Sequence, residues 1–517
     1  MSYRQIKIGT RGSPLAMWQT NEVLRLIRRK FPSLNTKVII IKTSGDKFSG
    51  SLSTTHDSRV TNHDYAGKGL FVKEMEEALA SGRIDMAVHS LKDMPAILPK
   101  GLSLVAYLKR EDPSDLFISK KYKNISSLPK GAVFGTSSPR RKAQVLSVRP
   151  DLRVIPLRGN VATRLEKLLS GECEATILAN AGVKRLDLTR KLTRLRTHAL
   201  THFIPAIGQG IISVETRTAD KDLIYYIRSS LNDAATESAA LAERAFLKKV
   251  TGDCHTPIAA YAQLKGKKVV LKGFASSPSG KKTISASREG SNPSNVGREL
   301  GAKFVKLGAR KLMRPLVLFT GLRCDRKKFQ GSDVVHLPLI KILPPSDNYR
   351  SLDSAIKRLN EYDWLVFTSQ TAVERFFERI THGSWRKAPK IAAVGPTTAE
   401  KVRSYGRRVD LMPGLDFNSA ELARKLLIFK VQGLKILFPR AKEGKDALVK
   451  ELSRMGAHVD LVEAYRTVPN KINVKKWKAL FKKRPPDEVV IQSESADNVF
   501  KKYFHCCPKS HFKTYGP

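Results

Sequence analysis

The sequence predicts an α/β protein with several domains. The chain has 517 residues, of which 41% are hydrophobic, so it is long enough for roughly three to four domains with buried cores. Short apolar runs alternate with longer runs of helical spacing, which is the pattern of α/β folds. Several of these short runs end in Gly, Ser, Thr or Arg just before a helix, where α/β folds bind ligands.

The charge balance is strongly basic. There are 93 Lys and Arg residues against 47 Asp and Glu residues, which gives a formal net charge of +46. Such a charge would suit nucleic acid, but the basic residues are spread along the whole chain, with no RNA-binding aromatic motif or zinc-finger spacing. We therefore expect no nucleic-acid partner. A general basic bias of the proteome and a polyanionic small substrate are the other two explanations of the charge.

Hydropathy and cysteine usage indicate a cytoplasmic protein. No apolar run reaches the roughly 18 residues of a membrane span, and residues 1–13 contain no apolar segment of a secretory signal. The five cysteines are irregularly spaced, without a C-x-x-C pair. We therefore expect a reducing compartment, no membrane partner and no metal site.

The first strand and helix place polar groups together. Residues 5–12 read as a strand and turn, after which Ser13 and a proline open a helix over 15–31. Arg11 and Ser13 therefore lie beside a helix N-terminus, which is either an anion site or an ordinary helix cap. A second strand is predicted over 38–41.

The next segment leads to a polar strand end. A long polar stretch over 47–69, which we expect to be a mobile lid or disordered, precedes a helix over 70–81 and a strand over 84–88. That strand ends in His89, Ser90, Lys92 and Asp93. Aspartate and lysine in this position suit acid/base work and charge stabilisation, with a surface salt bridge as the alternative.

Three further strand ends repeat this design. The predicted strands at 133–134, 154–157 and 175–178 each lead into a helix. Their ends carry hydroxyls and five arginines: Thr136, Ser137, Ser138, Arg140, Arg141, Arg158, Arg164 and Arg185. Together with Arg11, Lys68 and Lys92, these residues predict a cleft for a substrate with many carboxylates, because arginine binds carboxylates through paired hydrogen bonds.

Cys254 lies on a predicted loop in a third, smaller unit. A mainly helical stretch over 221–250 precedes the loop, and strand-like runs over 258–264, 268–275 and 283–288 with a helix over 296–307 complete an α+β unit. From these residues the thiol can be a nucleophile, a metal ligand, a covalent tether or an inert buried side chain.

Six motifs before this loop carry a family resemblance. They are Gly9-Thr10-Arg11-Gly12-Ser13-Pro14-Leu15-Ala16, Gly67-Lys68-Gly69-Leu70-Phe71, Val88-His89-Ser90-Leu91-Lys92-Asp93, Gly135 to Arg141, Arg158-Gly159-Asn160-Val161 and Gly208-Gln209-Gly210. Residues 4 to about 312 thus resemble hydroxymethylbilane synthase (porphobilinogen deaminase) of haem biosynthesis. The resemblance implies two lobes like those of periplasmic binding proteins plus a small cofactor domain. The implied boundaries are 1–108 and 209–226, 109–208, and 227–312.

The resemblance also implies a reaction and roles for the residues. Cys254 would hold a dipyrromethane cofactor through a thioether, and four porphobilinogens would be added to it with release of ammonia before the linear tetrapyrrole is hydrolysed off. Asp93, with Lys92, would act on the cationic pyrrole and its protons. The acetate and propionate groups would bind Arg11, Ser13, Lys68, Ser90, Thr136, Ser137, Ser138, Arg140, Arg141, Arg158, Arg164 and Arg185.

Three positions depart from the family pattern. Asp253 replaces a glycine before the cysteine, Pro139 replaces a leucine, and Asp64 stands where a lysine is common. A carboxylate next to the Cys254 thiol would raise its pKa if close, but a thiol that reacts once as a permanent anchor needs no strongly lowered pKa.

Residues 313–517 form a second α/β region. Strands are predicted over 316–319, 364–367, 390–394, 435–438 and 488–491, with helical runs between them and hydroxyl-rich ends. This region is similar to uroporphyrinogen-III synthase through Phe367-Thr368-Ser369, Ala393 to Ala399, Met455-Gly456-Ala457 and Glu463 to Pro469. The family has two α/β lobes, here 313–347 with 466–517, and 348–465. The cleft would contain Thr368, Ser369, Thr397, Tyr465 and Ser493.

The segments Leu343–Pro345 and Arg466–Pro469 would be the two crossings between these lobes. The family pattern expects a further Gly-Pro-type turn and a final helix, and the chain stops at Tyr515-Gly516-Pro517. The sequence therefore predicts a monomeric, cytoplasmic, bifunctional enzyme acting on porphobilinogen and a linear tetrapyrrole. The alternative is deaminase activity alone, with a non-catalytic C-terminal domain. A simple binding module would have no use for Cys254 and Asp93.

Overall fold

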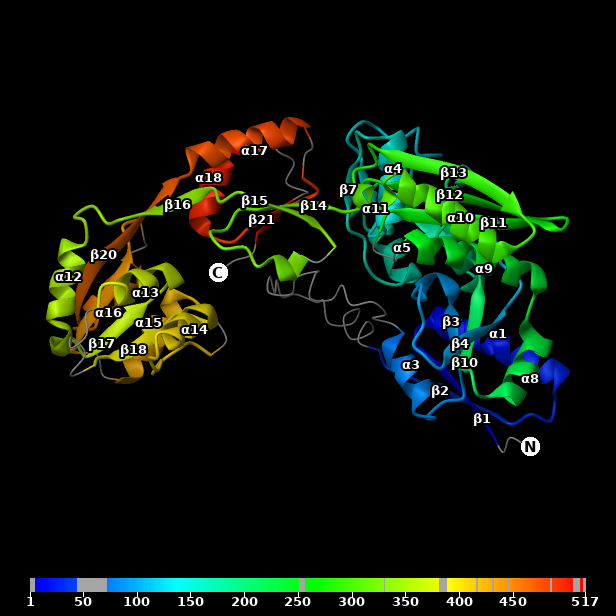
Figure 1. Ribbon diagram of the computed structural model, residues 1–517, viewed down its shortest axis with the longest axis horizontal. Helices are drawn as coiled ribbons and strands as arrows, with labels where there is room; N and C mark the ends of the chain where they lie inside the picture. Colours follow the sequence, from blue (N-terminus) through cyan, green and yellow to red (C-terminus); the bar gives the residue numbers. More distant parts are fainter. Residues whose placement is uncertain are drawn as a thin grey trace. The chain divides into compact units, whose positions relative to one another are not determined.

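The computed structural model shows two compact units (Figure 1), which are described separately. One comprises Met1–Val317, Arg326–Asp333 and Lys509–His511, and the other comprises Leu318–Asp325, Val334–Pro508 and Phe512–Pro517. The structure describes residues 5–43, 72–250, 256–329, 331–380, 388–414, 417–429, 432–443, 447–483, 486–504 and 512–514. Cys254, Lys68, Asp253 and Asp64, the predicted lid and the last three residues lie outside them.

The first sheet has the strand order β2-β1-β3-β10-β4. Its strands are β1 (Ile6–Thr10), β2 (Thr36–Ile40), β3 (Met86–Ser90), β4 (Leu102–Tyr107) and β10 (Ile212–Arg217). The helices α1 (Pro14–Lys30), α3 (Lys73–Ala80) and α8 (Lys221–Leu231) accompany it. β1 is parallel to β2 and β3, whereas β10 is antiparallel to β3 and β4.

The two faces of this sheet pack against different helices. Val23, Leu223 and Ile227 of α1 and α8 pack with Met86, Val88 and Val214 in one buried cluster. On the opposite face Met75, Ala78 and Leu79 of α3 pack with Ala87. The alternation of side chains along β3 therefore sends Val88 toward α1 and His89 toward the α3 side.

The second sheet has the order β7-β6-β8-β5-β9. Its strands are β5 (Asp115–Ser119), β6 (Val133–Gly135), β7 (Arg153–Ile155), β8 (Ala175–Ala179) and β9 (Arg196–Ala199). Its helices are α4 (Pro139–Val148), α5 (Val161–Leu169), α6 (Asn180–Arg185) and α7 (Thr189–Leu192). β6 is parallel to β7 and β8, and β5 is antiparallel to β8 and β9.

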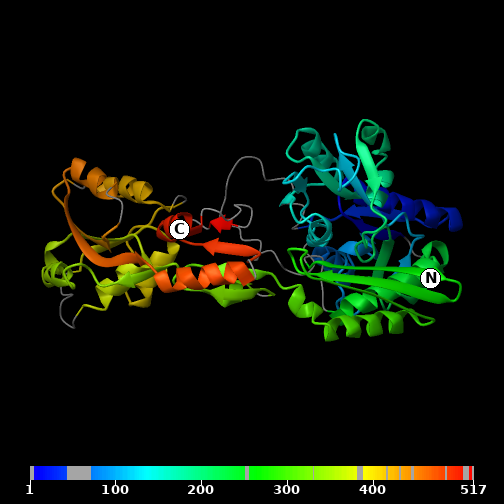
Figure 2. The same ribbon diagram turned by 90° about the horizontal axis from the view of Figure 1, so that it is seen from above.

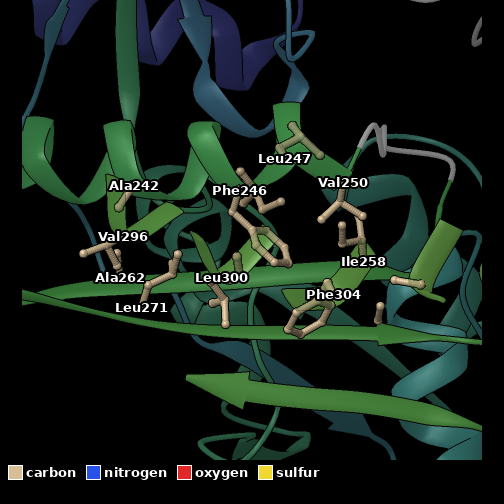
Figure 3. Close-up of a cluster of buried hydrophobic side chains, with 14 of the residues drawn as sticks. Ala242, Phe246, Leu247, Val250, Ile258, Ala262, Leu271, Val296, Leu300 and Phe304 are labelled. Carbon is tan, nitrogen blue, oxygen red and sulfur yellow. The ribbon is translucent and has the colours of Figure 1, made fainter. Parts of the chain in front are cut away.

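A three-stranded antiparallel sheet with two long helices forms the third part of this unit. It comprises α9 (Ala234–Val250), β11 (Ile258–Lys265), β12 (Lys268–Ser276), β13 (Thr283–Gly290), α10 (Pro293–Lys306) and α11 (Ala309–Leu312). α10 lies along this sheet (Figure 2). Phe246, Leu271, Leu300 and Phe304 fill the core between the sheet and its helices (Figure 3).

The second unit has two sheets. One has the order β15-β14-β21-β22 and the other β16-β20-β19-β17-β18. The strands are β14 (Leu316–Phe319), β15 (Asp333–His336), β16 (Ile340–Leu343), β17 (Trp364–Phe367), β18 (Lys390–Ala393), β19 (Lys435–Ala441), β20 (His458–Pro469), β21 (Glu488–Ile491) and β22 (Phe512–Thr514). The helices are α12 (Arg350–Lys357), α13 (Gln370–Phe377), α14 (Pro396–Ser404), α15 (Ser419–Leu426), α16 (Ala447–Arg454), α17 (Lys471–Lys483) and α18 (Glu494–Phe504).

The two predicted crossings of the second unit lie side by side. β16 pairs antiparallel with the end of β20, so that Leu343 lies opposite Arg466 and Ile340 opposite Pro469. The Arg466 Nε donates a hydrogen bond of 2.9 Å to the Pro344 carbonyl.

The predicted α/β class is confirmed in both units, but the sequence analysis does not predict β4, β5, β9 and β10 in the first unit or β15 and β22 in the second. β10 returns to the first sheet after the whole second sheet has been completed. Its partners are more than 100 residues away, so local spacing contains no signal for this pairing. The helical stretch predicted over 221–250 is also divided, since α8 ends at Leu231 and α9 begins at Ala234.

Candidate active site

Lys92 and Asp93 lie on a short turn that directly continues β3. The 3-10 helix η1 (Leu91–Asp93) buries Leu91, leaves Lys92 half-buried and exposes Asp93. The Leu91 N–H donates to the Ile211 carbonyl at 3.0 Å. Gly208 passes close to the same turn with a φ of +72°, and a Cβ there would lie 2.7 Å from the Leu91 Cγ. The turn is therefore fixed from the side of the returning chain.

A small cavity adjoins this turn in the first unit. It is lined by Leu15, Gln19, Ser90, Lys92, Ala179, Ala181, Gly182, Arg185, Gly208, Gln209, Gly210 and Ile211. The lining thus combines elements of the first sheet, elements of the second sheet and the chain that crosses between them. Ser90 and Gln19 face each other in it, with 2.8 Å between the Ser90 Oγ and the Gln19 Nε2.

Lys92 has a perturbed amine. Burial lowers its pKa, and the nearby Arg141 and Arg164 lower it further, whereas Asp93 and Asp115 act in the opposite direction. Burial also lowers the pKa of Arg164 to about 10, with Arg141 adding to the effect and Asp93 opposing it. Positive charge is therefore concentrated around Asp93 in excess of the local negative charge, which favours an anionic ligand.

Arg140 and Arg141 are buried and engage Asp115. The Arg140 Nη1 lies 2.7 Å from the Asp115 Oδ2, and the Arg141 Nη2 lies 2.8 Å from Oδ1. Although burial opposes ionisation, the two guanidinium groups hold the pKa of Asp115 well below its usual range. The Gln209 Nε2 donates to the same carboxylate at 2.9 Å. Asp115 therefore ties α4 to the crossing chain.

The other basic residues occupy different settings. The Arg185 Nη2 donates to the Gly210 carbonyl at 2.7 Å, and its guanidinium lies 5.6 Å from the centre of the Trp18 ring. The Arg164 Nε donates to the Gly159 carbonyl at 2.8 Å. Arg11 is half-buried just after β1, and Arg158 is exposed.

The predicted hydroxyls mainly act as helix caps. The Ser13 Oγ accepts the Ala16 N–H at the start of α1, and the Ser138 Oγ accepts the Arg141 N–H at the start of α4. The Thr136 Oγ1 accepts the Ser138 N–H at 3.2 Å, while Ser137 is exposed. The ordinary cap, one of the two alternatives considered for Ser13, is therefore present. A cap does not by itself exclude a ligand from the same helix end.

Both flanks of the cysteine segment are anchored in one core. Val250 at the end of α9 and Ile258 at the start of β11 are buried in the cluster shown in Figure 3. The seven residues between them, 251–257, include Cys254. The flanking packing restricts where this segment begins and ends.

Sequence reasoning missed two polar anchors of this site. The motifs do not point to Asp115, although it joins Arg140 and Arg141, because it lies on β5 whereas both arginines lie on α4. Glu243, fully buried on α9, accepts hydrogen bonds from the Gly208 N–H at 2.6 Å and the Ala262 N–H at 2.9 Å, and pairs with Arg110 at 2.6 Å. The sequence contained one signal for Glu243, because it is a glutamate within the apolar stripe of a predicted helix.

The second unit brings two of its predicted residues together. The Ser369 Oγ lies 3.0 Å from the Tyr465 hydroxyl and also accepts the Ala372 N–H at the start of α13. Burial raises the pKa of Tyr465, and the hydrogen bond from Ser369 opposes this rise. Thr368 follows β17 and is half-buried, and Thr397 is exposed in the first turn of α14.

Ser493 belongs to the other sheet of the second unit. It follows β21, and its Oγ accepts the Ala496 N–H at 3.2 Å at the start of α18. The other four predicted residues are attached to the sheet that contains β17, β18 and β20. Ser493 therefore approaches a common cleft only if the two sheets face each other across it.

No group of three His, Cys, Asp or Glu side chains in the described ranges is arranged to hold a metal ion. None of the helices in the described part of the chain combines the length and apolar character needed to cross a membrane.

Comparison with known families gives three matches. Residues 6–225 match the family described as "Porphobilinogen deaminase, dipyromethane cofactor binding domain", and residues 238–306 match the "Porphobilinogen deaminase, C-terminal domain". Residues 326–510 match the family "Uroporphyrinogen-III synthase HemD".

Two individual relatives agree with the deaminase matches. A porphobilinogen deaminase of Carboxydothermus hydrogenoformans is 43% identical over 315 residues, covering 60% of this chain and 97% of the relative. One of Acidithiobacillus ferrooxidans is 42% identical over 308 residues, with 60% and 97% covered. The crystal structure of uroporphyrinogen III synthase from Thermus thermophilus is similar at 18% identity, a TM-score of 0.27, and coverage of 39% of this chain and 83% of that one.

Proposed function

This chain belongs to the porphobilinogen deaminase family and carries a uroporphyrinogen-III synthase domain, and we propose that it uses both in sequence. The deaminase part joins four porphobilinogen molecules into a linear tetrapyrrole and releases one ammonia for each. The synthase domain closes that product into a ring. We propose that the deaminase domains comprise 1–108 with 209–226, 109–208, and 227–312, and that the synthase lobes comprise 313–347 with 466–517, and 348–465.

The observation that carries the proposal is the exposed Asp93 carboxylate among half-buried cations. Burial lowers the pKa of both Lys92 and Arg164, so both cations gain when an anion enters beside them. Porphobilinogen brings carboxylates that supply those anions. Its ring becomes positive as ammonia leaves, and the Asp93 carboxylate stabilises that charge.

Lys92 and Asp93 have separate roles in this proposal. Lys92 holds a carboxylate of the substrate and keeps it next to the turn. Asp93 remains free to accept and return the proton at the pyrrole nitrogen, because it is exposed on the same turn. The hydrogen bond from the Leu91 N–H and the close passage of Gly208 fix the position of the turn, and therefore the positions of the Lys92 and Asp93 side chains relative to each other.

The residues present fit the dipyrromethane for which the matched family domain is described. Ser90, Lys92 and Arg185 line one cavity, and a group with several carboxylates would satisfy them. We propose that Cys254 holds dipyrromethane by a thioether, with Arg11, Ser13, Lys68, Thr136, Ser137, Ser138, Arg140, Arg158 and Arg164 around its carboxylates. When bound, it supplies the chain end to which substrate is added.

Arg141 acts differently from the other arginines in this proposal. Its Nε, Nη1 and Nη2 all donate within the protein, to Asp115 and to the Ile177 carbonyl. The described bonds of Arg140 come from Nη1 alone, to Asp115 and the Ile204 carbonyl. We therefore propose that Arg140 contacts a carboxylate of the ligand directly. Arg141 contributes mainly its positive charge, which acts on Lys92.

The covalent anchor is tested by the mass of the purified protein. We expect the intact protein to be heavier than its sequence by a two-pyrrole adduct, and Cys254→Ala to lose that adduct. Cys173→Ala is a suitable control, because Cys173 is buried in the second-sheet lobe and should leave the adduct unchanged. An active preparation with the unmodified mass would refute the anchor.

For the synthase domain, we propose a cleft formed by Thr368, Ser369, Thr397, Tyr465 and Ser493. The hydrogen bond between Ser369 and Tyr465 supports this choice, because it fixes a polar group at the start of α13 against one on β20. We further propose a monomeric enzyme of the cytoplasm that acts on small molecules and not on nucleic acid. Gel filtration with light scattering tests the monomer directly.

A further inference from the structure

A buried polar cluster lies behind the turn that carries Lys92 and Asp93. In the pairing of β10 with β3, Ser213 lies opposite His89 and Glu215 opposite Ala87. These four side chains share one face of the sheet, because neighbouring residues alternate between faces. It is the face against which α3 packs through Ala87, and Glu76 of α3 belongs to the same cluster.

A close pair between β3 and β10 lies at the centre of the cluster. The His89 Nε2 and the Glu215 Oε2 are 3.1 Å apart, with both side chains buried. The oxygens Glu76 Oε1, Glu215 Oε1 and Ser213 Oγ are buried and have no hydrogen-bond partner among the described residues. Buried carboxylate oxygens without partners are costly when ionised, so such a cluster is favoured with an additional proton.

Charged groups around Glu76 do not remove this cost. β10 contributes Glu215 and Arg217, of which Arg217 is engaged by Asp85 and by the Leu79 and Ile84 carbonyls. Arg244 of α9 donates to the Pro95 carbonyl at 2.9 Å and interacts electrostatically with Tyr107 and Glu215. Glu74 lies on α3 itself.

We propose that the half-buried Glu76 and the buried pair of His89 and Glu215 form a triad that stores one proton in mildly acidic solution and positions the catalytic turn after β3. His89 precedes that turn by two residues and donates to Glu215, which fixes the end of β3 against β10. Glu76 holds the stored proton as a neutral carboxyl group, so that only one negative charge is buried in the triad. His89 and Glu76 are positioning residues, since they act through β3 on Lys92 and Asp93.

The direction of the titration follows from the surroundings of Glu76. Burial raises its pKa to about 7, with Glu215 adding to the rise and His89 opposing it. The folded protein therefore binds more protons than the unfolded chain between about pH 4.5 and 7, so stability falls as pH rises through that window. Above it the folded protein carries a buried charge that Glu76→Gln would remove.

The proton is tested by thermal unfolding of the full-length holoenzyme at a series of pH values. We expect Glu76→Gln to melt close to wild type at pH 5 and a few degrees higher at pH 8.5. Glu77→Gln is the matched control, because Glu77 is the next residue of α3, is exposed and lies 3.8 Å from Lys73. A Glu76→Gln difference that does not change with pH would overturn the stored proton.

An infrared measurement keeps the proposal testable if Glu76→Gln fails to fold. A protonated buried carboxyl group should give a carbonyl band at pH 6 that disappears by pH 8.5 in wild type and in Glu77→Gln. Absence of that pH-dependent band would overturn the proposal. Neither this measurement nor the thermal one depends on the proposed reaction.

The positioning role rests on the proposed deaminase activity and is tested by kinetics. We expect His89→Ala to lower kcat by about tenfold or more with little change in KM, because the substrate contacts remain. His89→Gln should recover most of kcat, since its amide can donate to Glu215. An equal loss of kcat in both variants would refute the positioning role of His89. The thermal and infrared measurements would still test whether Glu76 stores a proton.

Discussion

At the scale of single residues, the proposed chemistry rests on Asp93 and its neighbours. Sequence alone could predict Lys92, Asp93 and the arginine-rich strand ends, because motifs and strand ends are local features. It could not predict that Asp115 would bind Arg140 and Arg141, because that network joins elements 25 and 26 residues apart. The protein thus holds Arg141 through all three side-chain nitrogens, whereas the described bonds of Arg140 come from its Nη1.

Asp93→Asn tests the charge that this residue contributes. The amide keeps the size of the side chain but cannot stabilise positive charge or take a proton. We expect kcat to fall by roughly 10²- to 10³-fold, the usual effect of losing one stabilising group in a transition state, while the two-pyrrole adduct stays in the mass spectrum. Turnover near the wild-type rate would remove Asp93 from the mechanism.

Asp115→Asn tests the buried ion network. The change leaves two buried guanidinium groups without their carboxylate, so we expect the free energy of unfolding of this lobe to fall by about 3–5 kcal/mol at pH 7. Because the pKa of Asp115 is lowered in the folded state, the wild type should keep this advantage above about pH 4 and lose it only as the pH falls further.

Urea unfolding at several pH values measures that difference. Asp151→Asn is the control, because Asp151 pairs with Arg149 at 2.7 Å in the same lobe and the pair is only half-buried, so its loss should cost less than that of the fully buried network. Equal losses in the two variants would contradict the stabilising role assigned to the buried network.

At the scale of elements, the site depends on the chain that returns from the second sheet to the first. Gly208, Gln209 and Gly210 contact the turn after β3, Asp115 and Arg185 respectively. Their motif was recognisable in the sequence, but its structural reason was not, because β10 was not predicted. Most parallel strands were predicted, since most of them are followed by a helix with a visible period.

Gly208→Ala tests the close passage beside the catalytic turn. A Cβ at this position would lie 2.7 Å from the Leu91 Cγ and 3.0 Å from the Leu91 carbonyl carbon, on a backbone with a φ of +72°. We expect the turn to shift and kcat to fall by roughly 10- to 100-fold, because small displacements of reacting groups are costly.

Gly131→Ala separates backbone strain from this clash. Gly131 has a φ of +75°, and no heavy atom in the described part of the chain lies within 4 Å of the added Cβ. It should lose about 1–2 kcal/mol of stability from backbone strain alone and keep its kcat. The same kcat in both variants would show that Leu91 does not transmit the position of Gly208.

At the scale of the whole molecule, one chain carries the catalysts for two successive steps. The net charge of +46 agrees with substrates that carry several carboxylates at every stage, and no nucleic-acid motif competes with that explanation. The sequence identified both enzyme families through their motifs. The pairing of β4, β5, β9 and β10 could be learned only from the structure, because it depends on contacts distant in sequence. The same holds for the polar anchors Asp115 and Glu243.

The most direct measurement supplies porphobilinogen to the full-length protein and identifies the product isomer. We expect the wild type to give mainly uroporphyrinogen III and Cys254→Ala to give no tetrapyrrole. Tyr465→Phe lacks the hydroxyl that contacts Ser369, so we expect it to give a larger share of uroporphyrinogen I. A wild-type product consisting only of uroporphyrinogen I, which forms when the linear tetrapyrrole closes spontaneously, would contradict the proposed two-step function.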